Sequence, residues 1–221
     1  MTFLALVWSF FILGWTLSQF GPSLYDLQLI TGTDLEEASF FYTSHNIGYL
    51  IGSLVSGALI GRCDCNFLLF VTMTLNSVSS TIIPWSSVSG FMIVSQALRG
   101  LSGGLLDTVA NSELLSLFGN KVSPYMQAMH FAFAVGGIAS PLVTAPFLAD
   151  DGDRMFPNST SIRIEIDITD YTDIPRNYNS IAFGNGSTDA NITPVINPQI
   201  SELYIPYTIS GVLALSSAIS F

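Results

Sequence analysis

Long apolar segments alternate with short polar connections along most of this chain. A helix that crosses the hydrocarbon core of a bilayer, roughly 30 Å thick, needs about 20 mainly apolar residues. Six segments have this character and are bounded by polar residues, glycine or proline: 3–20, 38–60, 67–83, a span within 90–118, 125–148 and 203–221. The pattern predicts an all-α integral membrane protein with six transmembrane helices, the last of them truncated at the chain end.

The first apolar segment has an alternative interpretation as a cleaved signal peptide. Signal peptides begin with positive charge and end in a small-residue cleavage site. No Lys or Arg precedes this segment, and no such cleavage site stands out before Gly21. We therefore expect residues 3–20 to remain as a transmembrane helix.

Residues 149–202 differ sharply from the segments on either side, 1–148 and 203–221. They are rich in Asp, Asn, Ser, Thr and Pro, and no apolar run within them is long enough to span a membrane. We expect a long extracellular loop that is disordered or weakly structured. Three N-x-Ser/Thr glycosylation sequences lie in it and none lies elsewhere, which favours the extracellular or lumenal side; their acceptors are Asn158, Asn185 and Asn191.

The short connections give an independent indication of orientation, because cytoplasmic loops carry an excess of Lys and Arg. With the long loop outside, counting segments places the N-terminus in the cytoplasm. Arg62 and Lys121 then lie in the two short inner connections, while the outer connections 21–37 and 84–89 contain no Lys or Arg. Both signals favour the same topology, and we expect a multi-pass protein of the plasma membrane.

Composition narrows the class further. Hydrophobic residues make up 49% of the chain and charged residues 10%, with a mean hydropathy of +0.53, too little charge for a water-exposed globular surface. The formal net charge is -10, but most acidic residues cluster within 26–37 and 150–202, so nucleic-acid binding is disfavoured. Cys63 and Cys65 are poorly spaced for a zinc site or a disulfide framework. We expect no metal site and no cofactor.

Ionisable side chains within an apolar span are costly and mark functional candidates. The fourth segment contains Arg99 and Asp107, which lie about 12 Å apart along a helix and within about 80° of one face. Asn111 follows Asp107 by one turn and shares its face. This polar stripe indicates either a functional pathway or an internal salt bridge or hydrogen-bond network that holds the helices together.

Two polar residues in the fifth segment, Gln127 and His130, are three positions apart and project towards one side. His130 suits contact with a polar solute or movement of a proton. A neutral histidine bonded within the helix bundle is the alternative. In and just after the second segment, Gly48, Gly52, Gly57 and Gly61 make small-residue spacings that indicate close helix packing.

These residues together resemble the major facilitator superfamily of secondary transporters. Gly57 and Arg62 match parts of its loop between the second and third helices, and Arg99 followed by Gly103 matches its fourth helix. The stretch Gly103-Gly-Leu-Leu-Asp107-Thr-Val-Ala-Asn111 is similar to the Gly-x-Leu-Glu/Asp-Thr-x-x-Asn signature of the fucose-permease branch and its animal relatives, the sodium-dependent glucose transporter 1 group. The resemblance extends over residues 3–148.

The resemblance implies the six-helix N-terminal half of a twelve-helix sugar transporter that works by alternating access. It implies that Asp107 and Arg99 serve ion coupling with Na⁺ or H⁺, and that Asn111, Gln127 and His130 contact a hexose-type sugar. His130 is a departure, because bacterial members have Gln at that position. The expected partners are the sugar, the lipid bilayer and the C-terminal half that this chain lacks.

Two other functions stay open at this stage. Gly100-Leu-Ser102-Gly103 fits the short GxSG pattern of rhomboid intramembrane serine proteases, with His130 as the base. The match is weak because glycine-rich segments produce it by chance, and we expect no enzyme. The other alternative is a membrane protein that does not transport, or an inactive truncated product.

Overall fold

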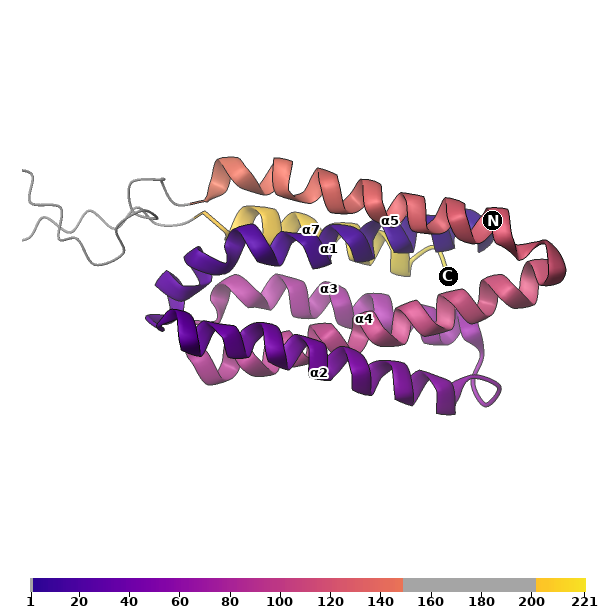
Figure 1. The fold of residues 1–221 in the computed structure, drawn as a ribbon, viewed down its shortest axis with the longest axis horizontal. Coiled ribbons are helices and arrows are strands. Elements are labelled where there is room, and N and C mark those ends of the chain that lie inside the picture. Colours follow the sequence, from indigo (N-terminus) through magenta and orange to yellow (C-terminus); the bar gives the residue numbers. More distant parts are fainter. Residues whose placement is uncertain (1, 149–201) are drawn as a thin grey trace, which may run out of the picture. The chain divides into compact units, whose positions relative to one another are not determined.

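The computed structural model describes residues 2–148 and 202–221, and α-helices form most of these two ranges (Figure 1). Short 3-10 turns follow three of the helices: η1 (Ile83–Trp85), η2 (Gly119–Lys121) and η3 (Ala145–Phe147). The α-helices are α1 (Thr2–Thr31), α2 (Leu35–Leu59), α3 (Cys65–Ile82), α4 (Ser89–Phe118), α5 (Val122–Thr144) and α7 (Tyr204–Ala218).

All six apolar segments lie largely within these helices, but α1 runs well beyond the end of its apolar segment. α1 continues past Gly21 and Pro22 to Thr31. A proline inside a helix removes one backbone hydrogen bond and crowds the carbonyl one turn earlier. The apolar face nevertheless continues beyond Pro22, with Leu27 fully buried in an outer apolar cluster. Tertiary packing therefore outweighs the break signal. α7, expected to run to the chain end, stops at Ala218.

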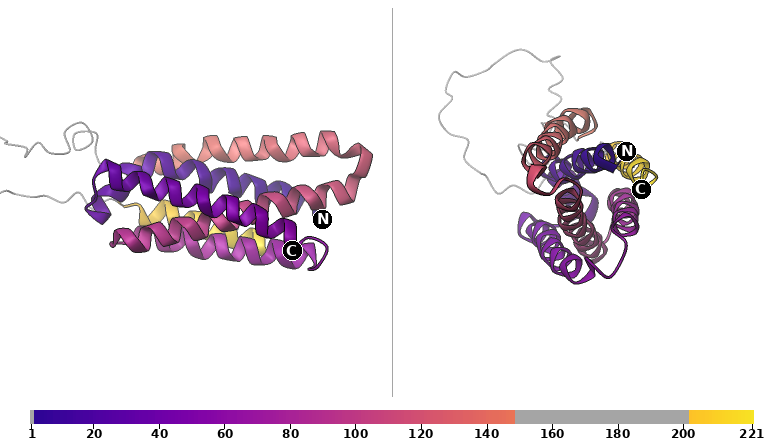
Figure 2. Two further views of the ribbon diagram at one scale, coloured as in Figure 1. Left: turned by 60° about the horizontal axis from the view of Figure 1, so that its bottom comes forward. Right: turned by 90° about the vertical axis from the view of Figure 1, so that its right-hand side faces the viewer.

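The helices pack mainly as three pairs, α2 with α4, α1 with α5, and α3 with α7, and α3 also contacts α4. Figure 2 shows α5 beside α1 and α2 beside α4 when the bundle is viewed along its length. The N-terminus, the α2–α3 and α4–α5 connections and the C-terminus all lie at one end of the bundle (Figure 1). Arg62 and Lys121 belong to those two connections, so the two basic residues lie at the same end.

Glycines bring the paired helices into backbone contact. On α2 and α4, a Cβ added at Gly48 would overlap the carbonyl oxygen of Ala97, and one added at Gly100 would overlap that of His45. Gly52 and Gly104 make the same kind of contact. The small-residue spacing of α2 therefore serves close packing, as predicted; Gly57, by contrast, faces open space.

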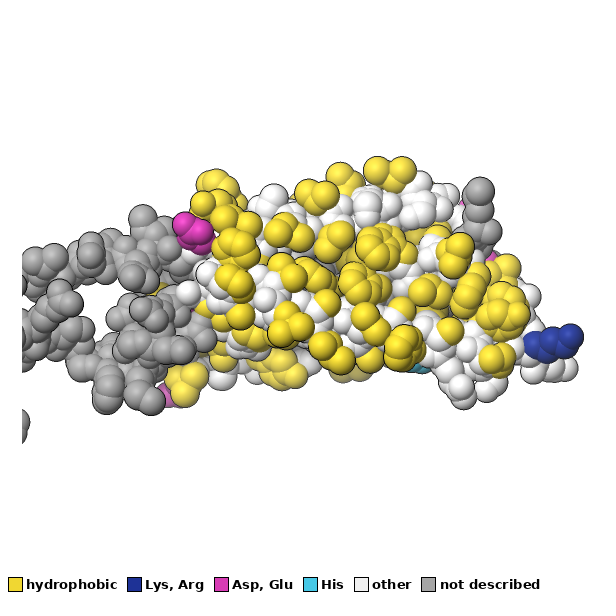
Figure 3. Space-filling model, turned by 90° about the horizontal axis from the view of Figure 1, so that it is seen from above, with side chains coloured by type: hydrophobic (Ala, Val, Ile, Leu, Met, Phe, Trp, Pro, Cys, Tyr) yellow, Lys and Arg dark blue, Asp and Glu magenta, His cyan; other side chains and the backbone are white. Residues whose placement is uncertain are grey.

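The polarity of the bundle suits a lipid surrounding. Its interior holds buried Ser, Thr, Gln, Asn and Arg side chains, while large apolar side chains are exposed along the helices, and they cover the face drawn in Figure 3. In the described residues, three segments are long and apolar enough to cross a membrane: Phe3–Thr31, Cys65–Trp85 and Ser89–Phe147, the last containing both α4 and α5. The fold is thus that of a helical membrane protein.

The number of crossings stays a prediction, because α7, with 15 residues, is shorter than the roughly 20 that a bilayer core requires. The long loop and its three glycosylation sequences, at Asn158, Asn185 and Asn191, lie outside the described residues except for Glu202.

Candidate functional site

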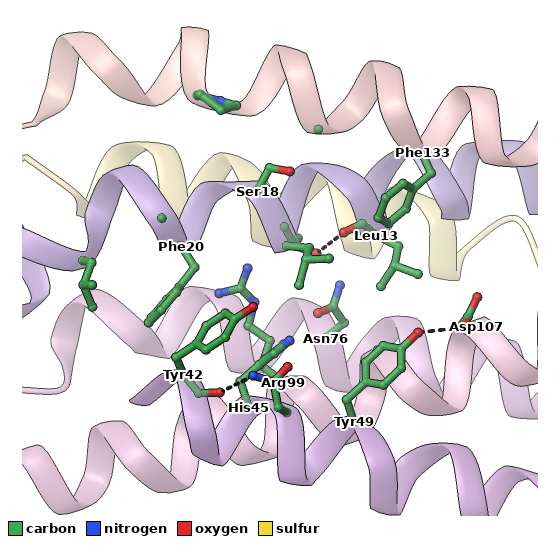
Figure 4. A pocket seen from close by; sticks show the side chains of 18 of the residues that line it. Leu13, Ser18, Phe20, Tyr42, His45, Tyr49, Asn76, Arg99, Asp107 and Phe133 are labelled. Atoms are coloured by element: carbon green, nitrogen blue, oxygen red, sulfur yellow. Dashed lines mark hydrogen bonds between the residues drawn. The ribbon is translucent and has the colours of Figure 1, made fainter. Parts of the chain in front are cut away.

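A cavity of about 800 Å³ lies among α1, α2, α4 and α5, with one residue from α3 (Figure 4). Its volume is within the range of roughly 300–1,000 Å³ that small-molecule sites occupy. Aromatic rings and a few polar groups form most of its wall. The lining includes Phe10, Thr16, Ser18, Phe20, Tyr42, His45, Asn46, Tyr49, Asn76, Arg99, Asp107, His130 and Phe133.

The cavity is closed towards the end of the bundle that carries the N-terminus. A cluster of buried apolar residues fills that end, including Leu6, Leu69, Met73 and Leu114. The lining residues instead extend towards the α1–α2 connection, as far as Leu24 and Ala38. The cavity therefore extends from the middle of the bundle towards the end opposite the two basic connections.

Asp107 is the acidic residue of the cavity wall, and it is held by two side chains. The Tyr49 hydroxyl on α2 donates a hydrogen bond of 2.7 Å to its Oδ2, and Asn111 Nδ2 donates one of 3.0 Å to its Oδ1. Asn111 also bonds the Asp107 carbonyl oxygen at 2.8 Å. Both oxygens of a carboxyl group that borders the cavity therefore accept bonds from neutral donors.

Arg99 also lines the cavity but makes no ion pair with Asp107 in the described part of the chain. It is 2% exposed. Neither Nη1 nor Nη2 has a hydrogen-bond partner among these residues. The Tyr207 hydroxyl from α7 lies near the guanidinium, in a geometry that makes no hydrogen bond to either nitrogen. The polar stripe is thus not joined by an internal salt bridge.

The two fifth-helix candidates differ in position. His130 lines the cavity and meets the Phe10 ring edge-on, with ring centroids 5.3 Å apart. Gln127 does not line this cavity; it borders a separate, shallower surface pocket that it shares with His130. Asn111 reaches the cavity only through its bonds to Asp107.

Several lining residues were missed by reasoning from the sequence. Tyr49 on α2 lies against α4, and the glycine spacing around it was the only signal for that contact face. His45, expected from the sequence near interfacial water at the outer end of its segment, also lines the cavity. Asn76 comes from the serine- and threonine-rich α3, where a single amide does not stand out. Tyr49 became a candidate only when the fold placed its hydroxyl on Asp107.

Ser102 is not placed to act as the nucleophile of a serine protease. Ser102 is fully buried, and its hydroxyl donates to the Arg99 carbonyl oxygen at 2.8 Å within its own helix. His130, the proposed base, lies against Phe10. A nucleophile and its base need to be within hydrogen-bonding reach, and these two side chains make no such contact.

Fold and site together define a class: a helical membrane protein with a largely apolar cavity of solute size, in whose wall two charged side chains, Arg99 and Asp107, lie. No protein-family profile matches the chain. No solved structure matches it.

Similar proteins are nevertheless known by sequence. The chain is 33% identical over 135 residues to sodium-dependent glucose transporter 1 of Homo sapiens, covering 61% of this chain and 26% of that protein. It is 33% identical over 161 residues to major facilitator superfamily domain-containing protein 4B of Danio rerio, covering 72% of this chain and 30% of that protein. It is 31% identical over 145 residues to major facilitator superfamily domain-containing protein 4A of Xenopus tropicalis, covering 65% of this chain and 29% of that protein.

These relatives confirm the resemblance to the major facilitator superfamily and to the sodium-dependent glucose transporter 1 group. The alignments span between a quarter and a third of the length of these three relatives. The relatives bear the names of transporters and not of enzymes, which is compatible with the expectation of a non-enzyme.

Proposed function

We propose that this chain is part of a secondary active transporter for a hexose-type sugar, coupled to Na⁺ or H⁺. The observation that carries the proposal is the position of Asp107: a carboxylate on a membrane helix that borders a cavity of about 800 Å³. Charged side chains at such positions mark solute and ion pathways. A relative named as a sodium-dependent glucose transporter supports the sugar and the cation.

On this proposal Asp107 binds the coupling cation. Tyr49 and Asn111 orient its carboxylate through the two hydrogen bonds, so the cation meets a preformed ligand. The solute occupies the cavity beside it, against the aromatic rings of Phe10, Phe20 and others. Cation and solute then share one site, and each favours binding of the other because both select the same conformation.

The cavity belongs to an alternating-access cycle in which a second set of helices completes the wall. We propose that this chain supplies the N-terminal half of a twelve-helix transporter and that the C-terminal half is its structural partner. With the N-terminus and Arg62 in the cytoplasm, the closed end of the cavity faces inward and the open end faces outward. This arrangement suits uptake of solute at the plasma membrane, with the long loop glycosylated outside.

The test is solute uptake by the protein reconstituted into vesicles, in full length with any sequence beyond Phe221. Labelled glucose and related hexoses are offered with an inward Na⁺ gradient, an inward H⁺ gradient, or neither. We expect accumulation above the external concentration with one of the two gradients. If hexose equilibrates across the membrane but does not accumulate under either gradient, transport is not coupled to Na⁺ or H⁺. Vesicles that take up no hexose would favour a membrane protein that does not transport.

A further inference from the structure

Arg99 has unpaired hydrogen-bond donors in the described part of the protein. The side chain is 2% exposed and lines the cavity, yet Nη1 and Nη2 both lack a hydrogen-bond partner there. Burial of these two terminal nitrogens is unfavourable, because they lose their hydration without gaining a hydrogen bond. The surroundings of Arg99 therefore suit a group that comes from outside the bundle.

Asn76 presents a second unpaired donor to the same cavity. It comes from α3, it is 2% exposed, and its Nδ2 has no partner in the described ranges. Figure 4 shows the Asn76 and Arg99 side chains reaching into the same part of the cavity. One turn before Arg99 on α4, Gln96 is fully buried with both amide atoms unpaired. Two helices thus contribute unmatched N–H groups at one place.

The unpaired atoms of Arg99 and Asn76 are all donors. An arginine has only donors, and the unpaired atom of Asn76 is its amide nitrogen. The carboxylate of Asp107 lies two turns further along α4, about 12 Å away along the helix axis. Both of its oxygens already accept bonds, from Tyr49 and Asn111. A ligand at Arg99 therefore has to bring acceptors, and the planar guanidinium fork favours two that are adjacent.

We propose that Arg99 and Asn76 form a donor subsite that holds two neighbouring oxygen atoms of the transported solute, those of a vicinal diol in the case of a sugar. This inference rests on the proposed transport of a sugar through the cavity. It makes Arg99 a solute-binding residue, which differs from the ion-coupling role expected from its position in the sequence. An inorganic anion such as chloride offers the same acceptor chemistry, and the test separates these two sources.

The test compares a transported hexose with its monodeoxy analogues, each lacking one hydroxyl. Exchange is measured across vesicles without any cation gradient, so that coupling does not enter. For the wild-type protein, removal of a hydroxyl held by Arg99 raises KM about 10- to 100-fold, because the buried donors are then left unpaired. In Arg99→Lys, which keeps the charge without the fork, and in Asn76→Leu, the same analogue is penalised no more than about threefold.

Asn46→Ala is the matched control. Asn46 also lines the cavity, but its amide already donates to the Tyr42 carbonyl oxygen at 3.0 Å. This variant keeps the full wild-type penalty for every analogue. Replacement of chloride by gluconate leaves the wild-type KM unchanged.

Three results would overturn the subsite. The first is an unchanged penalty in both Arg99→Lys and Asn76→Leu. The second is a wild-type protein that tolerates the loss of every hydroxyl in turn, a readout that needs no variant to fold. The third is a KM that is the same for the hexose and all its monodeoxy analogues but rises when gluconate replaces chloride. That result would assign the donors to an inorganic anion. A wild-type protein that exchanges no hexose overturns the proposed function as well, whereas exchange with an unchanged penalty overturns the subsite alone.

Discussion

Alanine at Gly100 tests the backbone contact between α2 and α4 on which the cavity wall depends. The added Cβ would overlap the His45 carbonyl oxygen, and a backbone atom cannot rotate away. Carbon and carbonyl oxygen normally stay about 3.3–3.6 Å apart, so the two helices have to separate locally by roughly 1 Å or more. Overpacking of this kind costs about 1–3 kcal/mol.

Gly57→Ala is a control with the opposite expected sign. Gly57 lies on α2, and a Cβ there meets nothing within 4 Å. Alanine favours a helix over glycine by up to about 1 kcal/mol, so this variant should be as stable as the wild type or more stable.

The assay is thermal unfolding of the purified protein in detergent. With roughly 2–4 °C for each kcal/mol in a protein of this size, Gly100→Ala should lower Tm by about 2–12 °C, and Gly57→Ala should not lower it. A separation of the helices would also stretch the 2.7 Å bond from Tyr49 to Asp107 beyond hydrogen-bonding distance. Equal melting temperatures for the two variants would refute the close contact and the position of α2 with it.

Three further outcomes follow from the site and the bundle. Tyr49→Phe removes a bond to the Asp107 carboxylate worth about 1.5–3 kcal/mol. Because that bond orients the carboxylate for the cation, the KM for the cation in transport should rise roughly tenfold, and an unchanged or lower KM would contradict the orienting role. Ser210→Ala breaks two hydrogen bonds to α1, of 2.9 and 2.7 Å, and should lower the free energy of unfolding by about 1–2 kcal/mol. Ser216→Ala, at an exposed serine, is the control and should lower it little. Equal losses of stability in the two variants would count against the buried network. Replacing the asparagine of each glycosylation sequence by glutamine should lower the apparent mass on a gel as glycosidase treatment does, and a wild-type protein insensitive to the glycosidase would contradict an external loop.

The helices could be predicted from the sequence because the apolar segments have the length that a membrane requires. Their ends were less predictable. Pro22 and Gly21 are break signals, yet α1 passes through them since Leu27 has a buried apolar environment to reach. The sequence of residues 21–31 alone does not show that Leu27 will pack against other helices.

The candidate site was predictable in part, for a physical reason. Arg99, Asp107 and His130 are conspicuous because ionisable groups are rare in apolar segments, and all three line the cavity. Tyr49 and Asn76 are ordinary residues of membrane helices, and their importance arises only from what lies opposite them in the fold. Gln127 was conspicuous for the same reason as His130, but it borders a different pocket.

The central claim is that Asp107 links the movement of a cation to that of a sugar, and one comparison tests it most directly. Asp107→Asn keeps the size of the side chain and an acceptor for Tyr49 but removes the charge, and Glu113→Gln on the same helix, away from the cavity lining, serves as its control. We predict that Asp107→Asn still exchanges labelled hexose across vesicles without a gradient but no longer accumulates it when a cation gradient is applied, while Glu113→Gln does both. Accumulation by Asp107→Asn at the wild-type level would contradict the account.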